Sequence, residues 1–150
     1  MKLSSKSEYG LRAMYDLAEF HGTGPISIKS IAERQDISDA YLEQLFALLK
    51  KSSIVKSIRG AQGGYMLARE PGDITVGEVL EALEGPFSPM DCVRTSGPEP
   101  CKRTEYCVTR QIWSKLKDAV DDVLENITLQ DMKEEAAKIR SGKDCYMYYI

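Results

Sequence analysis

The 150-residue sequence contains a single histidine and no long uninterrupted run of apolar residues. The lone His21, which we interpret as a surface residue at a helix end, leaves no Ser–His–Asp set and no cluster of imidazoles. These absences argue against a hydrolase of the triad type and against a histidine-rich metal centre. Without an apolar run there is neither a membrane-spanning helix nor a signal peptide. The sequence therefore predicts a cytoplasmic protein, not an enzyme, with no membrane partner and no small-molecule substrate.

Acidic residues are missing from positions 44–69, although the whole chain has a net charge of −3. Residues 1–69 carry ten lysines and arginines against seven aspartates and glutamates, whereas residues 70–150 carry ten against sixteen. A basic segment in an otherwise acidic chain suggests a binding site for a polyanion. A solvated face that happens to be basic is the alternative.

Apolar residues at helical spacing predict a first helix over residues 6–21 and a pair of helices further on. Ser27 and Ser38 are placed to cap the two helices of that pair, which span residues 28–51. Two helices joined by about three residues are typical of a helix-turn-helix, and a plain helical hairpin is the alternative.

Two short strand-like segments, residues 54–58 and 65–68, follow the helix pair. Between them, Arg59-Gly-Ala-Gln-Gly-Gly64 can form a tight hairpin, because glycine accepts positive φ angles and adds no bulk at the tip. A helix-turn-helix followed by a hairpin over 54–68 predicts a mainly α, winged helix-turn-helix fold.

The second half of the chain reads as helices around a long loop. A helix over 74–84 precedes a Pro-, Gly- and Ser-rich stretch over 86–104. A long apolar stripe then predicts a helix over 105–126, about 33 Å long at 1.5 Å per residue. We interpret it as a dimerisation helix, with packing onto its own domain as the alternative. Thr128 caps a final short helix, and residues 141–150 read as a tail.

Three of the four cysteines, Cys92, Cys101 and Cys107, lie in one stretch of the predicted loop. Disulfides rarely persist in the cytoplasm, so clustered thiols favour metal binding or redox sensing. The spacing lacks the close cysteine pair of zinc sites but suits an iron–sulfur cluster. The spacing alone leaves a cluster, a zinc site and a redox thiol switch open. Cys145 lies in the tail, outside this motif.

Several segments carry a resemblance to a known family. They are MKLSSKSEYGLRAM, ISDAYLEQLFALLKK, SIRGAQGGYMLA, ITVGEVLEALEG, the three-cysteine loop, CVTRQIWSKL and ENITLQDM. Over nearly its whole length the chain resembles the IscR-type regulators, winged-helix repressors that sense iron–sulfur status or nitric oxide. The resemblance implies a homodimer that binds palindromic double-stranded promoter DNA and controls iron–sulfur cluster biogenesis or related iron and redox genes.

The resemblance also implies one iron–sulfur cluster per subunit, held by Cys92, Cys101 and Cys107. The similarity to IscR favours 2Fe-2S, and 4Fe-4S is the alternative. IscR-like members commonly place a histidine three residues after the last cysteine, but this chain has Arg110 there, and a guanidinium cannot coordinate iron. Some related regulators use an acidic residue near the N-terminus of the partner subunit, and Glu8 matches that place.

Three other accounts of the fourth ligand stay open: Glu8 is only the partner of Ser5 in a capping box, a water completes the site, or a small thiol does. Two other functions stay open as well. The chain could be a nitric oxide or redox sensor of the same fold, or a zinc-stapled interaction module without a DNA role.

In a winged helix, the second helix of the pair enters the major groove by its N-terminal end. We therefore expect Ser38 and Tyr41 to contact phosphates and Gln44 to pair with adenine. Glu43 either accepts from a cytosine amino group or faces solvent. Arg59 suits a narrow minor groove, and the lysines add salt-dependent affinity. The full predicted DNA-binding set is Ser38, Ala40, Tyr41, Glu43, Gln44, Lys50, Lys51, Lys56, Arg59 and Gly60.

The sequence is thus divided into four parts. Residues 1–84 form the DNA-binding domain, 85–107 a cluster-binding loop, 105–140 the dimerisation and C-terminal helices, and 141–150 a tail. Since the loop joins the first part to the third, we expect it to become ordered when a cluster binds and to set the spacing of the two recognition helices in the dimer.

Overall fold

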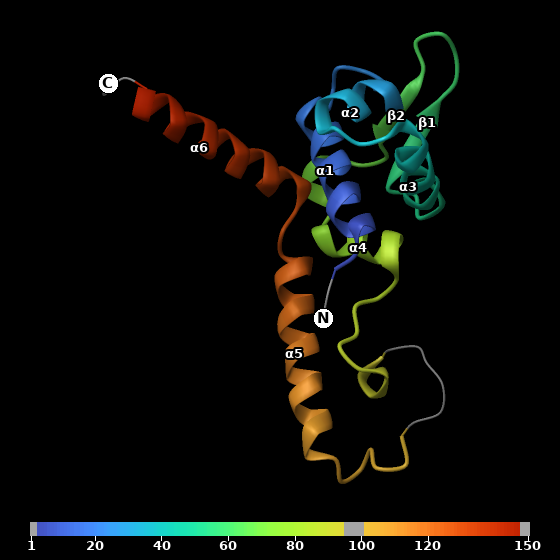
Figure 1. Ribbon diagram of the computed structural model, residues 1–150, viewed down its shortest axis with the longest axis vertical. Helices are drawn as coiled ribbons and strands as arrows, with labels where there is room; N and C mark the ends of the chain where they lie inside the picture. Colours follow the sequence, from blue (N-terminus) through green and yellow to red (C-terminus); the bar gives the residue numbers. More distant parts are fainter. Residues whose placement is uncertain (1–2, 95–100, 148–150) are drawn as a thin grey trace.

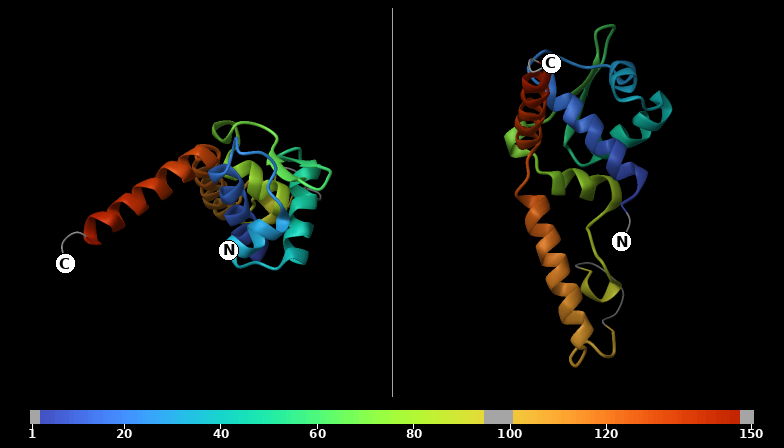
Figure 2. Two further views of the ribbon diagram at one scale, coloured as in Figure 1. Left: turned by 90° about the horizontal axis from the view of Figure 1, so that it is seen from above. Right: turned by 60° about the vertical axis from the view of Figure 1, so that its left-hand side comes forward.

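The computed structural model describes residues 3–94 and 101–147, which form a packed body and two helices that extend from it (Figure 1). The elements are α1 (Ser5–Glu19), α2 (Ile28–Gln35), α3 (Asp39–Lys51), β1 (Val55–Ile58), β2 (Gly64–Leu67), η1 (Pro71–Asp73), α4 (Val76–Glu84), η2 (Asp91–Val93), α5 (Val108–Glu125) and α6 (Leu129–Met147). The body contains α1 to α4 and the two strands, whereas α5 and α6 project from it in different directions (Figures 1 and 2). This order of elements is the predicted mainly helical winged-helix architecture.

Serine hydroxyls begin both helices of the helix-turn-helix. The Ser27 Oγ accepts from the amide of Ser30 at 3.1 Å, and the Ser38 Oγ accepts from the amide of Tyr41 at 3.3 Å. Between the helices, Asp36 adopts a left-handed backbone (φ 54°), which reverses the chain within a few residues. The two predicted caps are therefore confirmed.

The apolar face of α3 forms the centre of the body. Phe46 is fully buried, and its ring lies 4.7 Å from that of Tyr65 in β2. The residues buried around it include Ala13, Met14, Leu17, Ile31, Leu42, Leu45, Leu49 and Val79. Because removal of this apolar surface from water is strongly favourable, it fixes which face of α3 remains outside.

An ion pair between the buried Asp16 and the partly exposed Arg34 joins α1 to α2. Asp16 is only 2% exposed and accepts hydrogen bonds from Nε and Nη2 of Arg34 at 2.9 and 2.6 Å. The side-chain amide of Gln35 donates a third bond at 3.1 Å, and the guanidinium of Arg34 lies 4.4 Å from the ring centre of Phe20. The pair fixes the position of the helix-turn-helix on α1, and sequence analysis did not identify it.

The predicted wing is confirmed as an antiparallel pair, in register from Val55–Leu67 to Ile58–Gly64. Its second strand also bridges to the loop before α2, where Ile26 and Tyr65 exchange backbone hydrogen bonds of 2.9 and 2.8 Å. A Cβ atom at Gly64 would overlap the backbone of Ile26, so glycine permits this close approach. The wing is thereby fixed to the loop before α2 at the end of the hairpin that adjoins its turn.

The predicted capping box of Ser5 and Glu8 is wrong. The N-cap of α1 is Ser4, whose Oγ accepts from the amide of Lys6 at 3.1 Å, while Glu8 is exposed. The amide of Ser4 donates at 3.2 Å to the carboxylate of Glu84, which takes the place expected for Glu8. A residue 80 positions away in the sequence therefore completes this helix start. By contrast, the capping boxes that begin α4 and α6, at Thr75 and Thr128, are present.

Helix α5 runs back toward the body from the far end of the loop that carries the cysteines (Figure 1). It spans Val108–Glu125, close to the predicted 105–126, and none of its residues is buried. The prediction of a short final helix is wrong, because α6 has 19 residues. It continues through Met147 and so includes most of the predicted tail. Within the described ranges, no helix is both long and apolar enough to span a bilayer.

Candidate nucleic-acid interface and cysteine segment

The N-terminal turn of α3 presents polar side chains to solvent. Ser38, Ala40, Glu43 and Gln44 are exposed, and Tyr41 is half-buried. The hydroxyl of Tyr41 lies 3.2 Å from the Ser5 Oγ of α1, and its ring meets that of Tyr9 edge-on at 5.9 Å. This part of α3 is therefore fixed from behind by α1 while its outer face stays free.

The predicted basic residues extend this face from α3 to the wing. Lys51, Lys56, Arg59 and Gly60 are exposed, and Gly60 adopts a φ of 121° at the tip. Lys50 is also exposed, and its Nζ donates to the Ser57 Oγ of β1 at 2.7 Å, so it links α3 to the wing. We call the exposed set the α3–wing surface: Ser38, Ala40, Glu43, Gln44, Lys50, Lys51, Lys56, Arg59 and Gly60.

The α3–wing surface lies on the side of the body away from α5 and α6 (Figures 1 and 2). The structure brings all ten predicted DNA-binding residues onto α3 and the wing, with two of them, Tyr41 and Lys50, also making internal contacts. The N-terminal end of α3 is exposed, and an α-helix fits into the major groove of DNA. A basic hairpin lies beside it, which is the arrangement that winged helices present to DNA.

The three predicted cluster ligands lie in the cysteine segment, residues 85–107, of which 95–100 are outside the described part. Cys92 in η2 and Cys107 at the start of α5 are half-buried, Cys101 is exposed, and all three are free thiols. The Nε of Arg110 donates to the carbonyl oxygen of Cys92 at 3.2 Å. Arg110 therefore holds the first cysteine against the helix that the last cysteine begins.

Cys107 occupies the N-cap position of α5, where unpaired backbone amides favour negative charge. The Thr109 hydroxyl, 3.1 Å from the Cys107 Sγ, and the backbone amide of Arg110 both lower the pKa of this thiol. A thiolate is the form that binds metal, so the local structure prepares Cys107 for ligation.

The donor chemistry of the segment suits an iron–sulfur cluster, because it offers three free cysteines, one of them with a lowered pKa. Among the described residues, however, no three side chains of Cys, His, Asp or Glu are grouped closely enough to hold a metal ion. Glu8 is exposed on α1 and belongs to no such group. A cluster would need the cysteines drawn together and a further donor. The side chain of Cys145 lies outside the described part.

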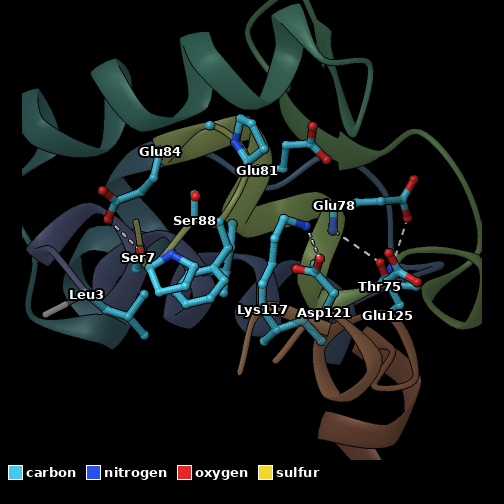
Figure 3. A pocket seen from close by; sticks show the side chains of 17 residues that line it. Leu3, Ser7, Thr75, Glu78, Glu81, Glu84, Ser88, Lys117, Asp121 and Glu125 are labelled. Carbon is cyan, nitrogen blue, oxygen red and sulfur yellow. Dashed lines mark hydrogen bonds and ion pairs between the residues drawn. The ribbon is translucent and has the colours of Figure 1, made fainter. Parts of the chain in front are cut away.

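A pocket of about 660 Å³ is lined by α4, α5 and the start of the cysteine segment (Figure 3). Its walls include Leu80, Phe87 and Leu124, and its rim carries several carboxylates. Lys117 and Asp121 of α5 form an ion pair there. Glu84 faces Ser7 of α1 and accepts from its hydroxyl at 2.5 Å. The serine bonds lower the pKa of Glu84.

The fold and the α3–wing surface define a winged helix-turn-helix DNA-binding protein. Residues 3–135 match the Rrf2 family, described as "Iron-dependent Transcriptional regulator", and the chain belongs to this family. It is therefore a transcriptional regulator and not an enzyme.

Relatives of two kinds are similar to the chain over most of its length. CymR of Bacillus subtilis is 44% identical over 150 residues, which cover both proteins completely. IscR of Enterobacter sp. (strain 638) is 42% identical over 132 residues, covering 88% of this chain and 79% of that protein. Both are named HTH-type transcriptional regulators.

Solved structures of the same two kinds share the fold. The structure of B. subtilis CymR, described as the global cysteine regulator, matches with a TM-score of 0.75 at 43% identity, over 90% of this chain and 98% of that one. T. potens IscR matches with a TM-score of 0.73 at 48% identity, over 91% of this chain and 88% of that one. The prediction of an IscR-type relationship is thus confirmed, within a family that also contains CymR.

Proposed function

We propose that the protein is a cytoplasmic homodimeric repressor that binds palindromic promoter DNA and senses iron–sulfur status through a cluster held by its cysteine segment. The observation that carries this proposal is the position of the thiols. Three free cysteines lie in the segment that joins α4 of the DNA-binding body to α5. A change of ligation there would act on both parts at once.

DNA binding is assigned to the α3–wing surface. The first turn of α3 would enter the major groove, where Gln44 can pair with adenine and Glu43 can accept from cytosine. Ser38 and Tyr41 would contact phosphates from the same turn. Arg59 at the wing tip would enter the minor groove. Gly60, beside it, leaves the tip narrow.

The homodimer is assigned to α5. Its apolar side chains are uncovered: Val108 is 72% exposed, Ile112 56% and Val123 55%. Such a stripe favours a second copy of the helix, and a two-fold axis would place two recognition helices on the two halves of a palindrome. An Ile112→Asp variant would shift the protein to a monomer in sedimentation analysis, whereas Asp118→Lys, exposed on the polar face of the same helix, would not.

The cluster is assigned to Cys92, Cys101 and Cys107, with Glu8 of the partner subunit as the fourth ligand and 2Fe-2S as the cluster type. The exposed position of Glu8 on α1 leaves it available to a second copy. When bound, the cluster supplies a redox-active centre whose loss reports iron or oxidant levels. The target genes on this proposal are those of cluster biogenesis or related iron and redox functions.

A second candidate is a regulator that responds to cysteine supply. The 44% identity to CymR over all 150 residues supports it, since the structure of that protein is described as the global cysteine regulator. The two candidates share the DNA interface and differ in the cysteine segment. The amount of iron–sulfur cluster in the purified protein therefore distinguishes the two candidate functions.

The experiment is anaerobic purification followed by visible absorption, iron and sulfide analysis, and DNA binding with and without the cluster. We expect brown protein with iron and sulfide in equal amounts, lost in Cys92→Ala and reduced in Glu8→Ala. Colourless protein that still binds promoter DNA would favour the second candidate. Unchanged spectra in Glu8→Ala would remove Glu8 from the ligands, and equal affinity in both states at every site would contradict the switch.

A further inference from the structure

Glu84 is the last residue of α4 and makes several contacts to the start of α1. Its Oε1 accepts from the amide of Ser4 at 3.2 Å, from the hydroxyl of Ser7 at 2.5 Å, and from the hydroxyl of Ser4. Ser7 is only 3% exposed, so Glu84 supplies the partner that a buried hydroxyl needs. Figure 3 shows the carboxylate turned toward Ser7.

Glu84 also stands where the cysteine segment begins. Gly85 follows at the C-cap of α4 with a φ of 85°, and the chain then lines the pocket beside α5 before it reaches Cys92. Any displacement of this stretch acts first on the end of α4. The Glu84 carboxylate therefore bonds to α1 from the position directly before the cysteine segment.

The same turn of α1 contacts the recognition helix on its other side. The hydroxyls of Ser5 and Tyr41 lie 3.2 Å apart, and the Tyr9 ring meets Tyr41 edge-on. Ser4 and Ser7 face Glu84 within the turn that carries Ser5. A continuous set of hydrogen bonds and contacts thus runs from the end of α4, through one helical turn, to the DNA-facing turn of α3.

We propose that Glu84 is a positioning residue that couples the cysteine segment to Tyr41 through the first turn of α1. The inference rests on the proposed function, because it concerns how a change at the thiols alters DNA affinity. Glu84 holds the α1 turn in the place from which Ser5 and Tyr9 support Tyr41. When the cysteine segment moves, the carboxylate moves with the end of α4 and the support of Tyr41 changes.

The first test needs no cluster. Backbone amide resonances of the full-length apo protein are compared for wild type, Glu84→Ala and the matched control Glu81→Ala. The Glu81 carboxylate is exposed on the same helix and has no hydrogen-bond partner among the described residues. We expect Glu84→Ala to shift the resonances of residues 4–8 and of Tyr41, and Glu81→Ala to leave them. An unchanged Tyr41 resonance in Glu84→Ala would overturn the proposal.

The second test compares DNA affinity with and without the cluster. We expect wild type to differ at least about fivefold between the two states, and Glu84→Ala and Ser5→Ala to bring the ratio close to one with unchanged iron content. Glu84→Gln keeps an acceptor oxygen, so its DNA affinities with and without the cluster should differ by a factor between that of Glu84→Ala and that of wild type. A purely structural role would lower thermal stability and affinity in both states equally, and that result would overturn the proposal.

The two proposals fail in different ways. Equal DNA affinity of wild type with and without the cluster contradicts the proposed switch. The resonance comparison then tests only whether Glu84 affects the position of Tyr41. A wild-type ratio that persists unchanged in Glu84→Ala leaves the proposed function standing and removes Glu84 from it.

Discussion

The Nε of Arg110, in the first turn of α5, donates a 3.2 Å hydrogen bond to the carbonyl oxygen of Cys92 in η2. Arg110 follows Cys107 by three residues, so the bond joins the start of α5 to the first of the three cysteines. IscR-like proteins commonly have a ligating histidine at this position. Here the side chain cannot bind iron, and instead it fastens the first cysteine near the last one.

On the proposed function, replacing Arg110 by Ala should weaken cluster retention without preventing assembly. Residues that orient metal ligands typically contribute about 10- to 100-fold in metal affinity, so we expect iron loss to a chelator to be about tenfold faster. The measurement is the decay of visible absorbance under anaerobic conditions. Lys115→Ala, an exposed change on the same helix, is the control. Equal decay in the two variants would contradict the role of Arg110.

Asp16→Ala should destabilise the body strongly. The change leaves the Arg34 guanidinium without its buried partner, a loss that costs about 3–5 kcal/mol for a fully buried pair. The side chain of Arg34 is 37% exposed, so water compensates in part, and we expect about 3 kcal/mol at most. Urea unfolding measures the difference. Glu33→Ala, an exposed neighbour, should change the free energy of unfolding by less than about 0.5 kcal/mol.

Changes on the α3–wing surface should separate affinity from specificity. Lys51→Ala and Lys56→Ala should each lower the dependence of log affinity on log salt by about one unit and act alike on all DNA sequences. Gln44→Ala should relax discrimination at one base pair by about 1–3 kcal/mol. Titrations at several salt concentrations test both. Lys138→Ala on α6 serves as the control, and an effect there equal to that of Lys51 would place the interface elsewhere.

The stability of α4 should fall in acid through Glu78. Burial raises the pKa of this carboxyl, but the amide and hydroxyl of Thr75 and the guanidinium of Arg69 outweigh burial, and the net pKa is lowered. A carboxyl with a lowered folded-state pKa contributes stability above its unfolded pKa of about 4.3 and loses it as the pH falls through the folded value.

The free energy of unfolding of wild type should therefore exceed that of Glu78→Gln at pH 7, and the difference should shrink below about pH 5. Urea unfolding at several pH values measures it. The matched control variant is Glu81→Gln, because this exposed carboxylate on the same helix lacks these partners among the described residues. If the free energies of unfolding of wild type and Glu78→Gln differed as much at pH 3 as at pH 7, the role assigned to Glu78 would be contradicted.

Local patterns in the sequence predicted most of the fold. The caps at Ser27, Ser38 and Thr75 lie within three residues of their amide partners, so the sequence contains both halves of each interaction. The wing and the buried face of α3 follow from periodicity and from the glycines of the tip. The ten residues proposed to contact DNA could be placed on α3 and the wing for the same reason.

What the sequence could not supply depends on contacts between distant residues. Ser4 rather than Ser5 begins α1, because Glu84 reaches it across the fold. The Asp16–Arg34 pair joins two helices, and neither residue is unusual in its own segment. The thiol spacing indicated a metal site but not the attachment of Cys92 to Arg110. The length of α6 was underestimated, because the helix continues through Met147 into the stretch that was predicted to be a tail.

Basic side chains on the α3–wing surface and carboxylates around the pocket between α4 and α5 give the protein an uneven charge distribution. In the field of a nucleic acid, such a molecule experiences a torque that turns α3 and the wing toward the duplex before contact. Collisions with the acidic part facing DNA are disfavoured, so a larger share of encounters is productive. The benefit is greatest in dilute electrolyte and fades as counterions shorten the range of the field to about 8 Å at 0.15 M ionic strength.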